Sequence, residues 1–169
     1  MTRAALALGA NLGDPRSTLR AAVAGLSAHP DVTVDRVSSL WRTAAVGGPE
    51  QPDYLNAVVL VDTDLDARAL LDLAHELEDA AGRVREVRWG PRTLDVDLLA
   101  VGDERSDDLE LSLPHPRAHE RRFVLDPWAE VEPEFVLAPA NGPARSVADW
   151  ASCATDQSAE KLEGGPWWR

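Results

Sequence analysis

Residues 88–99 read RWGPRTLDVDLL, and the last six of them place two aspartates inside an apolar run. The segment 93–102, TLDVDLLAVG, is apolar enough to predict a largely buried strand. Because residues i and i+2 of a strand point to the same face, Asp95 and Asp97 are expected side by side, with Cα atoms roughly 7 Å apart. Two such charges repel one another unless a cation lies between them. The pair therefore forms a candidate Mg²⁺ site, because carboxylate oxygens are suitable ligands for that ion.

Four arginines lie directly before this strand, at positions 83, 85, 88 and 92. Guanidinium groups form forked, charge-assisted bonds to phosphate oxygens. Each feature also has a simpler explanation. The arginines could belong to a solvated loop with local salt bridges, and the aspartates could lie on the solvent-facing side of a strand. Together, cations beside paired carboxylates are what phosphoryl-type transfer requires. The combination predicts a site for a nucleoside triphosphate.

Composition sets limits on the class of protein. The chain has 169 residues, 44% of them hydrophobic, which is enough for one domain with its own core. A formal net charge of -12 argues against general binding to nucleic acid or anionic membranes. The single cysteine excludes a disulfide framework and favours the cytoplasm. The N-terminal apolar run is too short for a secretory leader, and no stretch approaches the length of a membrane span. We expect a cytoplasmic monomer acting on small molecules.

Working outward from the strand at 93–102, the sequence predicts five further elements. Apolar strands are expected at 4–9, 32–43 and 54–63. A helix follows an N-cap at Asp14 and ends before Pro30, and a second helix begins near Asp66 and stops at Gly82. The order strand, helix, strand, strand, helix, strand predicts an α+β fold, a ferredoxin-like βαββαβ sandwich with extra C-terminal elements.

Signals are weaker after residue 103. We expect an acidic loop over 103–111 and two short helices, one within 112–125 and one within 126–136. The domain is expected to cover residues 1–152, with 153–169 as a poorly ordered C-terminal tail. Docking of Trp167 and Trp168 on the domain is an alternative that the sequence leaves open.

The sequence contains no P-loop, no dinucleotide-binding fingerprint and no zinc-ligand spacing. His115 lies between Pro114 and Pro116, a rigid setting in which a histidine is an unusual core residue. Tyr54 and Phe123 are more often core residues than ligand stackers in a chain with 5% aromatics.

Four ordered segments resemble the 6-hydroxymethyl-7,8-dihydropterin pyrophosphokinase family of folate biosynthesis. They are ALGANLGD (7–14), RTAAVGGPEQPDYLNAVV (42–59), ELEDAAGRVREVRWGPRTLDVDLL (76–99) and LPHPRAHERRFVLDPWAEV (113–131). The resemblance covers roughly residues 4 to 137. It implies a ferredoxin-like fold and transfer of pyrophosphate from ATP to the pterin hydroxymethyl group, with release of AMP.

The resemblance also implies roles for individual residues. Asp95 and Asp97 would hold two Mg²⁺ ions between ATP and pterin, and Arg83 and Arg92 would act with them in catalysis. The further residues implied in ATP binding are Glu78, Arg85, Arg88, Trp89, His115 and Arg121. Those implied in pterin binding are Asn11, Thr43, Val46, Tyr54, Asn56 and Phe123, with the ring between the two aromatic side chains. Separately, the Gly and Pro content of the loops 44–53 and 83–92 leads us to expect that they close over the substrates and exclude water.

Two other functions remain open from the residues alone. Ferredoxin-like nucleotidyl transferases also use paired aspartates on a strand, but they would release pyrophosphate instead of AMP. A regulatory ligand-binding module could share the same fold and would bind without turnover. The four segments favour the pyrophosphokinase.

Overall fold

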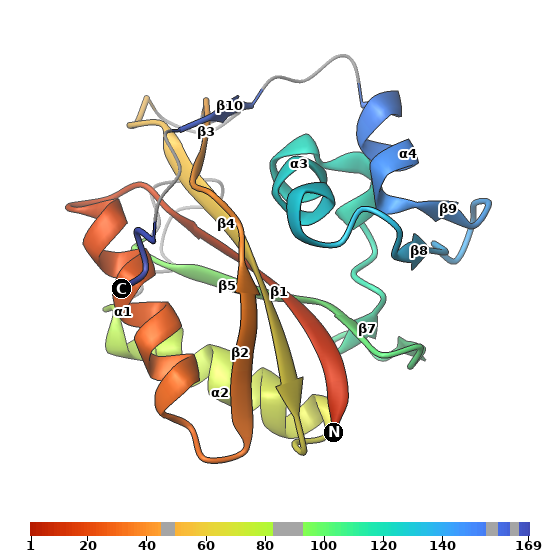
Figure 1. The fold of residues 1–169 in the computed structure, drawn as a ribbon, viewed down its shortest axis with the longest axis horizontal. Coiled ribbons are helices and arrows are strands. Elements are labelled where there is room, and N and C mark those ends of the chain that lie inside the picture. The colour runs from red at the N-terminus through yellow and green to blue at the C-terminus, as the bar shows by residue number, and fades with distance from the viewer. Residues whose placement is uncertain (45–49, 83–92, 155–158, 163–165) are drawn as a thin grey trace.

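The structure is a computed structural model that describes residues 1–44, 50–82, 93–154, 159–162 and 166–169. A central sheet has the strand order β10-β3-β4-β1-β5, and β2 also pairs with β4. All of these pairings are antiparallel. The strands are β1 (Thr2–Ala10), β2 (Val32–Val37), β3 (Trp41–Thr43), β4 (Tyr54–Thr63), β5 (Asp95–Val101) and β10 (Glu160–Lys161). The protein is therefore a mixed α/β protein built on an antiparallel sheet (Figure 1).

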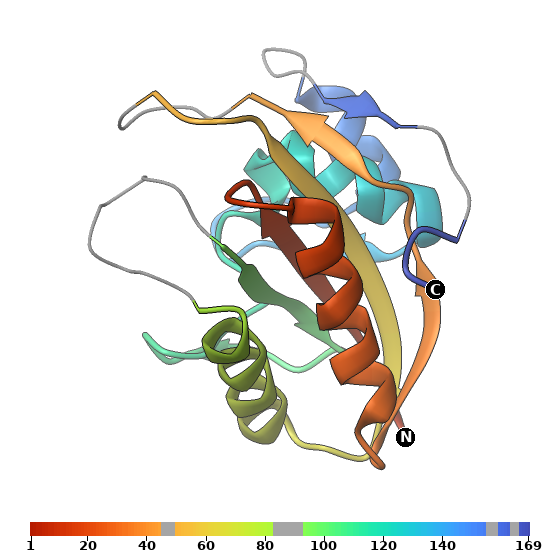
Figure 2. The same cartoon turned by 90° about the vertical axis from the view of Figure 1, so that its left-hand side faces the viewer.

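Helices α1 (Pro15–Ala28) and α2 (Ala67–Ala80) cover one face of the sheet (Figure 2). Their start signals are the predicted ones: Asp14 accepts a hydrogen bond from the Ser17 amide, and Asp66 accepts one from the Ala69 amide. After α2 the chain turns at Gly82, whose φ is 71°. Alternate residues of β1, β4 and β5 pack against these helices in the larger hydrophobic core.

The opposite face is covered by the C-terminal elements, chiefly α3 (Arg122–Val131) and α4 (Val147–Cys153). Leu125, Trp128 and Val147 form a second core there with the other faces of β1, β4 and β5. The short strands β8 (Val136–Leu137) and β9 (Arg145–Ser146) join α3 to α4 as a two-stranded sheet. The sheet thus lies between two helical layers (Figure 1).

The single strand predicted over 32–43 is wrong, because the chain forms β2 and β3 with a linker between them. Val37 pairs with Val59 and Trp41 pairs with Asn56, so the linker carries one residue more than its partner strand. The Ser38 hydroxyl accepts a hydrogen bond from the Val58 amide and so takes the place of a backbone carbonyl. A side chain that substitutes for a ladder bond allows the bulge without leaving a buried amide unpaired.

The region after residue 103 also differs from the expectation. The acidic loop contains a hairpin of β6 (Ser106–Asp107) and β7 (Ser112–Leu113). A 3₁₀ turn, η1 (Ala118–Glu120), precedes α3, and α3 is one helix that continues through Pro127 where two were predicted. Proline usually ends a helix. Here the apolar residues on both sides of it lie on one buried face, which favours a continuous helix.

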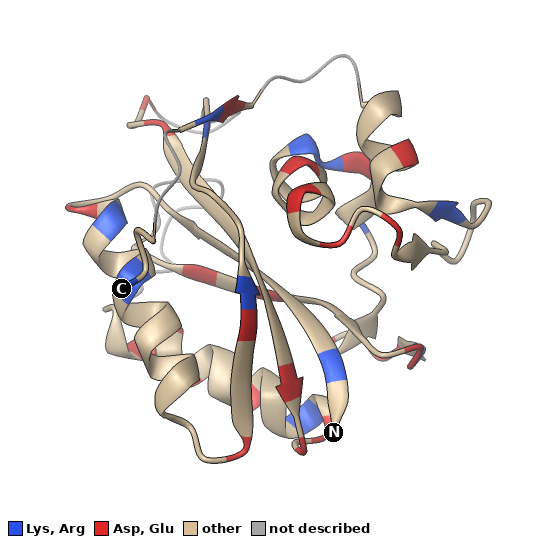
Figure 3. Ribbon diagram, in the orientation of Figure 1, with Lys and Arg blue, Asp and Glu red and all other residues tan. Residues whose placement is uncertain are grey.

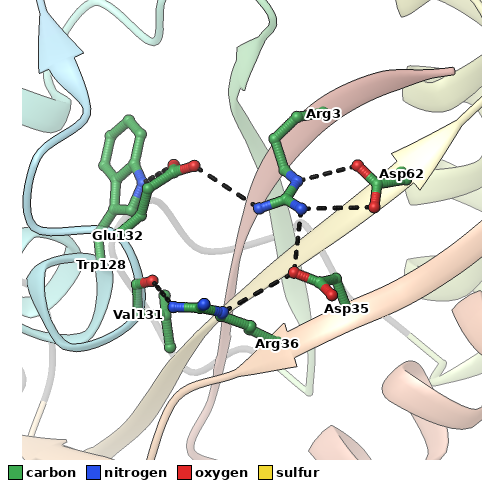
Figure 4. Close-up of polar contacts among 7 residues, drawn as sticks. All are labelled: Arg3, Asp35, Arg36, Asp62, Trp128, Val131 and Glu132. Carbon is green, nitrogen blue, oxygen red and sulfur yellow. Dashed lines mark hydrogen bonds and ion pairs between the residues drawn. The ribbon is translucent and has the colours of Figure 1, made fainter.

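A charge network fastens the end of α3 to the sheet (Figure 4). The Arg3 guanidinium on β1 lies 3.0 Å from both Asp62 and Asp35, and 3.9 Å from Glu132 at the end of α3. The indole N–H of Trp128 donates to the same Glu132 carboxylate over 3.1 Å. These contacts fix the C-terminal end of α3, and Arg121 at its N-terminal end interacts electrostatically with Asp95 and Asp97.

The C-terminal residues that the structure describes contact the sheet and α1. Trp167 is buried, its indole N–H donates to the Ser38 carbonyl over 2.8 Å, and its own carbonyl accepts from the Arg20 side chain. For Trp167 the structure therefore has the docked arrangement. None of the described helices is long and apolar enough to span a membrane.

Candidate active site

Most of the candidate residues on the sheet lie on the face that α3 covers. The register pairs Asp95 of β5 with Gly9 of β1, Gly9 with Asn56 of β4, and Asn56 with Trp41 of β3. Directly opposite residues of an antiparallel sheet share a face. Asp97, two positions further along β5, shares this face with Asp95. The register thus brings together a carboxylate pair and a polar amide from strands far apart in the sequence.

Gly9, which lies between Asp95 and Asn56 in the sheet, leaves room for the Asn56 side chain. A Cβ at position 9 would lie only 2.9 Å from the Asn56 side-chain oxygen, closer than real Cβ contacts. An isolated glycine inside a strand often marks such a close approach. Gly9 is not among the predicted site residues, although an isolated glycine in a strand is a signal that the sequence contains.

Glu78 of α2 contacts β5 from the face of the sheet that α1 and α2 cover. Its side chain is only 2% exposed, and its carboxylate accepts a 2.9 Å hydrogen bond from the Val96 amide. Val96 lies between the two aspartates and packs in the core on the α1 and α2 side. Asp95 and Asp97 are half-buried and lie on the other face. Glu78 therefore fixes the backbone at the centre of the carboxylate pair.

A cavity of about 260 Å³ opens at the edge of β5, next to Asp97. Its walls come from α2, from β5 and from the β6–β7 hairpin with the loop that follows it. They include His75, Glu78, Asp97, Leu98, Leu111 and His115. A backbone hydrogen bond of 2.9 Å from the His115 amide to the Leu99 carbonyl holds that loop against β5. The cavity joins apolar walls to carboxylates, as ligand pockets commonly do.

His115 is a neutral imidazole at this edge. Burial, and then the charges of Arg121 and Arg117, lower its pKa from 6.5 to about 4. Its Nδ1 atom accepts a hydrogen bond from the Arg117 amide over 3.2 Å. A neutral ring in this position can donate or accept hydrogen bonds without adding charge near a phosphate.

Arg121 is a cation whose pKa is affected by both carboxylates of the pair. Burial lowers the pKa of its guanidinium and Arg117 lowers it further, while Asp97, Glu120 and Asp95 act in the opposite direction. Arg121 therefore lies within electrostatic reach of both aspartates. Acidic positions occur in both helical layers and in the sheet (Figure 3), so a cation held here is a local feature of an otherwise acidic chain.

Arg121 also lies near the expected aromatic residue of α3, with its guanidinium carbon 5.6 Å from the Phe123 ring centroid. Phe123 is half-buried and packs against the core on the α3 side of the sheet. Tyr54 is half-buried at the start of β4, whose residues α3 contacts. Both aromatic residues thus belong to elements on the same side of the sheet.

Buried amides bring the first loop and the β3–β4 region together. Asn56 donates to the Thr43 hydroxyl over 2.8 Å, and Asn11 donates to the Gln51 side chain and to the Pro52 carbonyl over 2.8 and 3.0 Å. Asn56, Thr43 and Asn11 are each less than a tenth exposed. Hydrogen-bonded amides held rigidly in this way are suited to reading the polar edge of a small ligand.

The remaining candidates fall outside the described residues. They are Val46, Arg83, Arg85, Arg88, Trp89 and Arg92. Among the residues that the structure does describe, it brings together Asp95, Asp97, Glu78, His115 and Arg121 around the edge of β5. Asn56 and Tyr54 follow on β4, and Asn11 lies just after β1.

A carboxylate pair with a nearby arginine and a pocket at the same sheet edge is the kind of arrangement that phosphoryl transfer requires. The family model for 7,8-dihydro-6-hydroxymethylpterin-pyrophosphokinase (HPPK) matches residues 5–133. The chain belongs to this family, and it is therefore a pyrophosphokinase of the folate pathway.

Several relatives agree with this assignment, and each of the following three carries the name 2-amino-4-hydroxy-6-hydroxymethyldihydropteridine pyrophosphokinase. The one from Bacillus subtilis is 48% identical over 126 residues, 75% of each chain. The one from Methylorubrum extorquens is 45% identical over 137 residues, 81% of this chain and 87% of the relative. The one from Pseudomonas aeruginosa is 39% identical over 162 residues, 96% and 98% of the two chains.

Solved structures of similar fold include wild-type HPPK-DHPS of Plasmodium falciparum. The match has a TM-score of 0.69 and covers 92% of this chain and 45% of that one. The sequence identity is 13%, so this likeness concerns the fold alone. Our chain spans less than half the length of that solved chain.

Proposed function

We propose that the chain transfers pyrophosphate from ATP to the hydroxymethyl oxygen of 6-hydroxymethyl-7,8-dihydropterin and releases AMP. The observation that carries the proposal is the carboxylate pair on β5 with Arg121 beside it, in a chain of the HPPK family. The finer fold description, a ferredoxin-like domain over residues 1–152 followed by a C-terminal segment, is part of the same proposal. The strand order β3-β4-β1-β5 supports the ferredoxin-like part of this proposal, and β10 of the C-terminal segment pairs with β3 in the same sheet.

The donor set fits Mg²⁺. Among the described residues, no group of three or more His, Cys, Asp or Glu is arranged to hold a metal ion. Mg²⁺ does not need such a cage, because it keeps several waters and binds through one or two carboxylates together with substrate phosphates. Asp95 and Asp97 would hold two such ions, which when bound would neutralise charge on the triphosphate.

Phosphate binding is assigned to Arg121 and to the arginines that precede β5 in the sequence. Arg121 supports this role by its position near Asp97 and Asp95. Arg83 and Arg92, with Arg85, Arg88 and Trp89, are proposed to reach the same phosphates from the segment before β5. Guanidinium groups would absorb the charge that develops as AMP leaves. His115 and the cavity beside it are assigned to the nucleotide.

Pterin binding is assigned to the face of β4 and β3 under α3. Tyr54 and Phe123 are proposed to lie on the two sides of the ring, since flat heterocycles bind well by stacking on aromatic side chains. Asn56, Asn11 and the backbone around Thr43 and Val46 would read its polar edge. The loops 44–53 and 83–92 are proposed to close over both substrates and exclude water. A cytoplasmic monomer without a nucleic-acid partner completes the proposal, and the net charge of -12 supports it.

The test is a product assay with purified protein, ATP, Mg²⁺ and reduced 6-hydroxymethylpterin, in which the nucleotides are separated by chromatography. AMP formed only when the pterin is present is the expected result. ADP would indicate a simple kinase, and released pyrophosphate would indicate a nucleotidyl transferase. Folded protein that binds ATP without any turnover would leave the ligand-binding module as the better function.

A further inference from the structure

Glu130 of α3 is a hydrogen-bond acceptor for the linker between β2 and β3. Its two carboxylate oxygens accept from the Ser39 amide over 3.0 and 3.1 Å, from the Ser39 hydroxyl over 2.8 Å and from the Trp41 indole N–H over 3.0 Å. Lys161 of β10 lies 3.9 Å from the same carboxylate. Bonds to an ionised acceptor are among the stronger ones, so this contact is well suited to fix a position.

The contact joins the two elements that flank the proposed pterin site. Glu130 belongs to the same helix as Phe123, the residue assigned to one side of the ring. Trp41 begins β3, which ends at Thr43, the partner of Asn56. In the sheet register Trp41 lies directly opposite Asn56. A shift of β3 relative to α3 would therefore move Thr43 and Asn56 relative to Phe123.

β3 pairs with β4 at all three of its residues, but this ladder is short. It is only three residues long, and its partner on the outer side is the two-residue strand β10. The bulged linker before it carries one residue more than the opposing strand, so the sheet ladder does not continue through it. The backbone ladder fixes β3 within the sheet, and side-chain contacts are needed to fix its distance from α3.

The C-terminal segment also contacts the linker between β2 and β3, through Leu162 and Trp167. Leu162 donates its amide to the Leu40 carbonyl over 2.9 Å, and Trp167 donates its indole N–H to the Ser38 carbonyl over 2.8 Å. Residues 38 to 41 are thus held by α3 through Glu130 and by the chain end through backbone and indole groups. These anchors leave the linker little freedom.

We propose that Glu130 is a positioning residue for the pterin site: through Ser39 and Trp41 it sets the spacing between β3 and α3. The inference rests on the proposed assignment of Thr43, Asn56 and Phe123 to the pterin. Glu130 itself has no contact with substrate in this proposal. A misplacement of a binding wall by a fraction of an ångström to 1 Å is enough to weaken binding and turnover markedly.

The test compares Glu130→Gln with Glu134→Gln in the full-length protein. The side-chain amide introduced by Glu130→Gln would place a donor against the donors of Ser39 and Trp41, whereas Glu134 is an exposed carboxylate just after α3. We expect Glu130→Gln to raise the KM for pterin on the order of tenfold while the KM for ATP changes by less than about twofold. Glu134→Gln should leave both constants at the wild-type values.

A second variant covers the case in which Glu130→Gln does not fold. Trp41→Phe removes one donor to Glu130 and keeps an aromatic ring, and it should raise the KM for pterin in the same selective way, by a smaller factor. An equal rise in both KM values, or a lower melting temperature with unchanged KM values, would overturn the positioning role.

Asn56→Ala separates this inference from the site assignment beneath it. An unchanged KM for pterin in Asn56→Ala would remove the assignment of this face to the pterin. A raised KM in Asn56→Ala with a wild-type value in Glu130→Gln and Trp41→Phe would reject the positioning role and keep the site.

Discussion

The buried carboxylate of Glu78 accepts a 2.9 Å hydrogen bond from the amide of Val96, the residue between Asp95 and Asp97. A helix on one face of the sheet thereby fixes the backbone from which two carboxylates extend on the other face. The family resemblance implies an ATP contact for Glu78, and the structure adds a contact that the sequence did not predict. Glu78 also lines the cavity, so one side chain connects strand geometry to the nucleotide side of the site.

Replacing Glu78 tests this connection with a matched pair of variants. Glu78→Ala removes the acceptor and leaves the Val96 amide buried, which should lower the free energy of unfolding by about 1–3 kcal/mol. Glu78→Gln retains an acceptor oxygen, and it should be clearly more stable than Glu78→Ala. Urea unfolding measures the difference. Equal stabilities for the two variants would show that the hydrogen bond to Val96 contributes nothing.

The carboxylate pair can be tested by turnover and binding in the same variant. Asp97→Ala should lower kcat by at least about 100-fold, because a proposed Mg²⁺ ligand is worth several kcal/mol in the transition state. Pterin affinity, measured by fluorescence titration without nucleotide, should change far less. Asp103→Ala, which removes an exposed carboxylate from the loop after β5, is the control. A near-normal rate in Asp97→Ala would remove the metal assignment.

His115 predicts a dependence of stability on pH. Its pKa is about 4 in the folded protein and 6.5 in the unfolded chain, so between these values the unfolded chain binds a proton that the folded protein does not. The contribution is present in full above pH 6.5 and is lost as the pH falls toward 4. It amounts to about 2–3 kcal/mol.

The measurement is the free energy of unfolding at pH 7.5 and pH 4.5 for the wild type and for His115→Gln. The variant lacks the titrating group, so it should lose less stability on acidification than the wild type does. Other groups titrate in both proteins and cancel in the comparison. The same loss in both proteins would mean that His115 is not held neutral by its surroundings.

The parts of the fold that the sequence predicted are those with local signals. The Asp14 and Asp66 caps begin α1 and α2 as expected, and the alternation around Val96 describes β5 correctly. The division at Ser38 could not be predicted, because it depends on a hydroxyl that bonds to Val58, twenty residues away. Local periodicity does not contain such a partner.

The site shows the same division between local and distant signals. The aspartate pair is visible in five residues of sequence, and the structure places both residues on one face of β5. The contact of Glu130 with Ser39 joins residues 91 positions apart, and nothing in the sequence around Glu130 indicates it. Gly9 is an intermediate case. An isolated glycine in a strand is visible in the sequence, but the strand register is needed to show that it faces Asn56.

Gly9→Ala tests that register directly. The added methyl group would lie 2.9 Å from the Asn56 side-chain oxygen, so Asn56 must move and its 2.8 Å bond to Thr43 is disturbed. We expect the KM for pterin to rise on the order of tenfold, with a smaller effect on the KM for ATP. Gly25→Ala is the matched control, because its new methyl group would meet the Leu77 side chain between α1 and α2. That variant should lose stability and keep its KM for pterin. If both variants keep a wild-type KM for pterin, the face shared by Asp95 and Asn56 does not bind the ring.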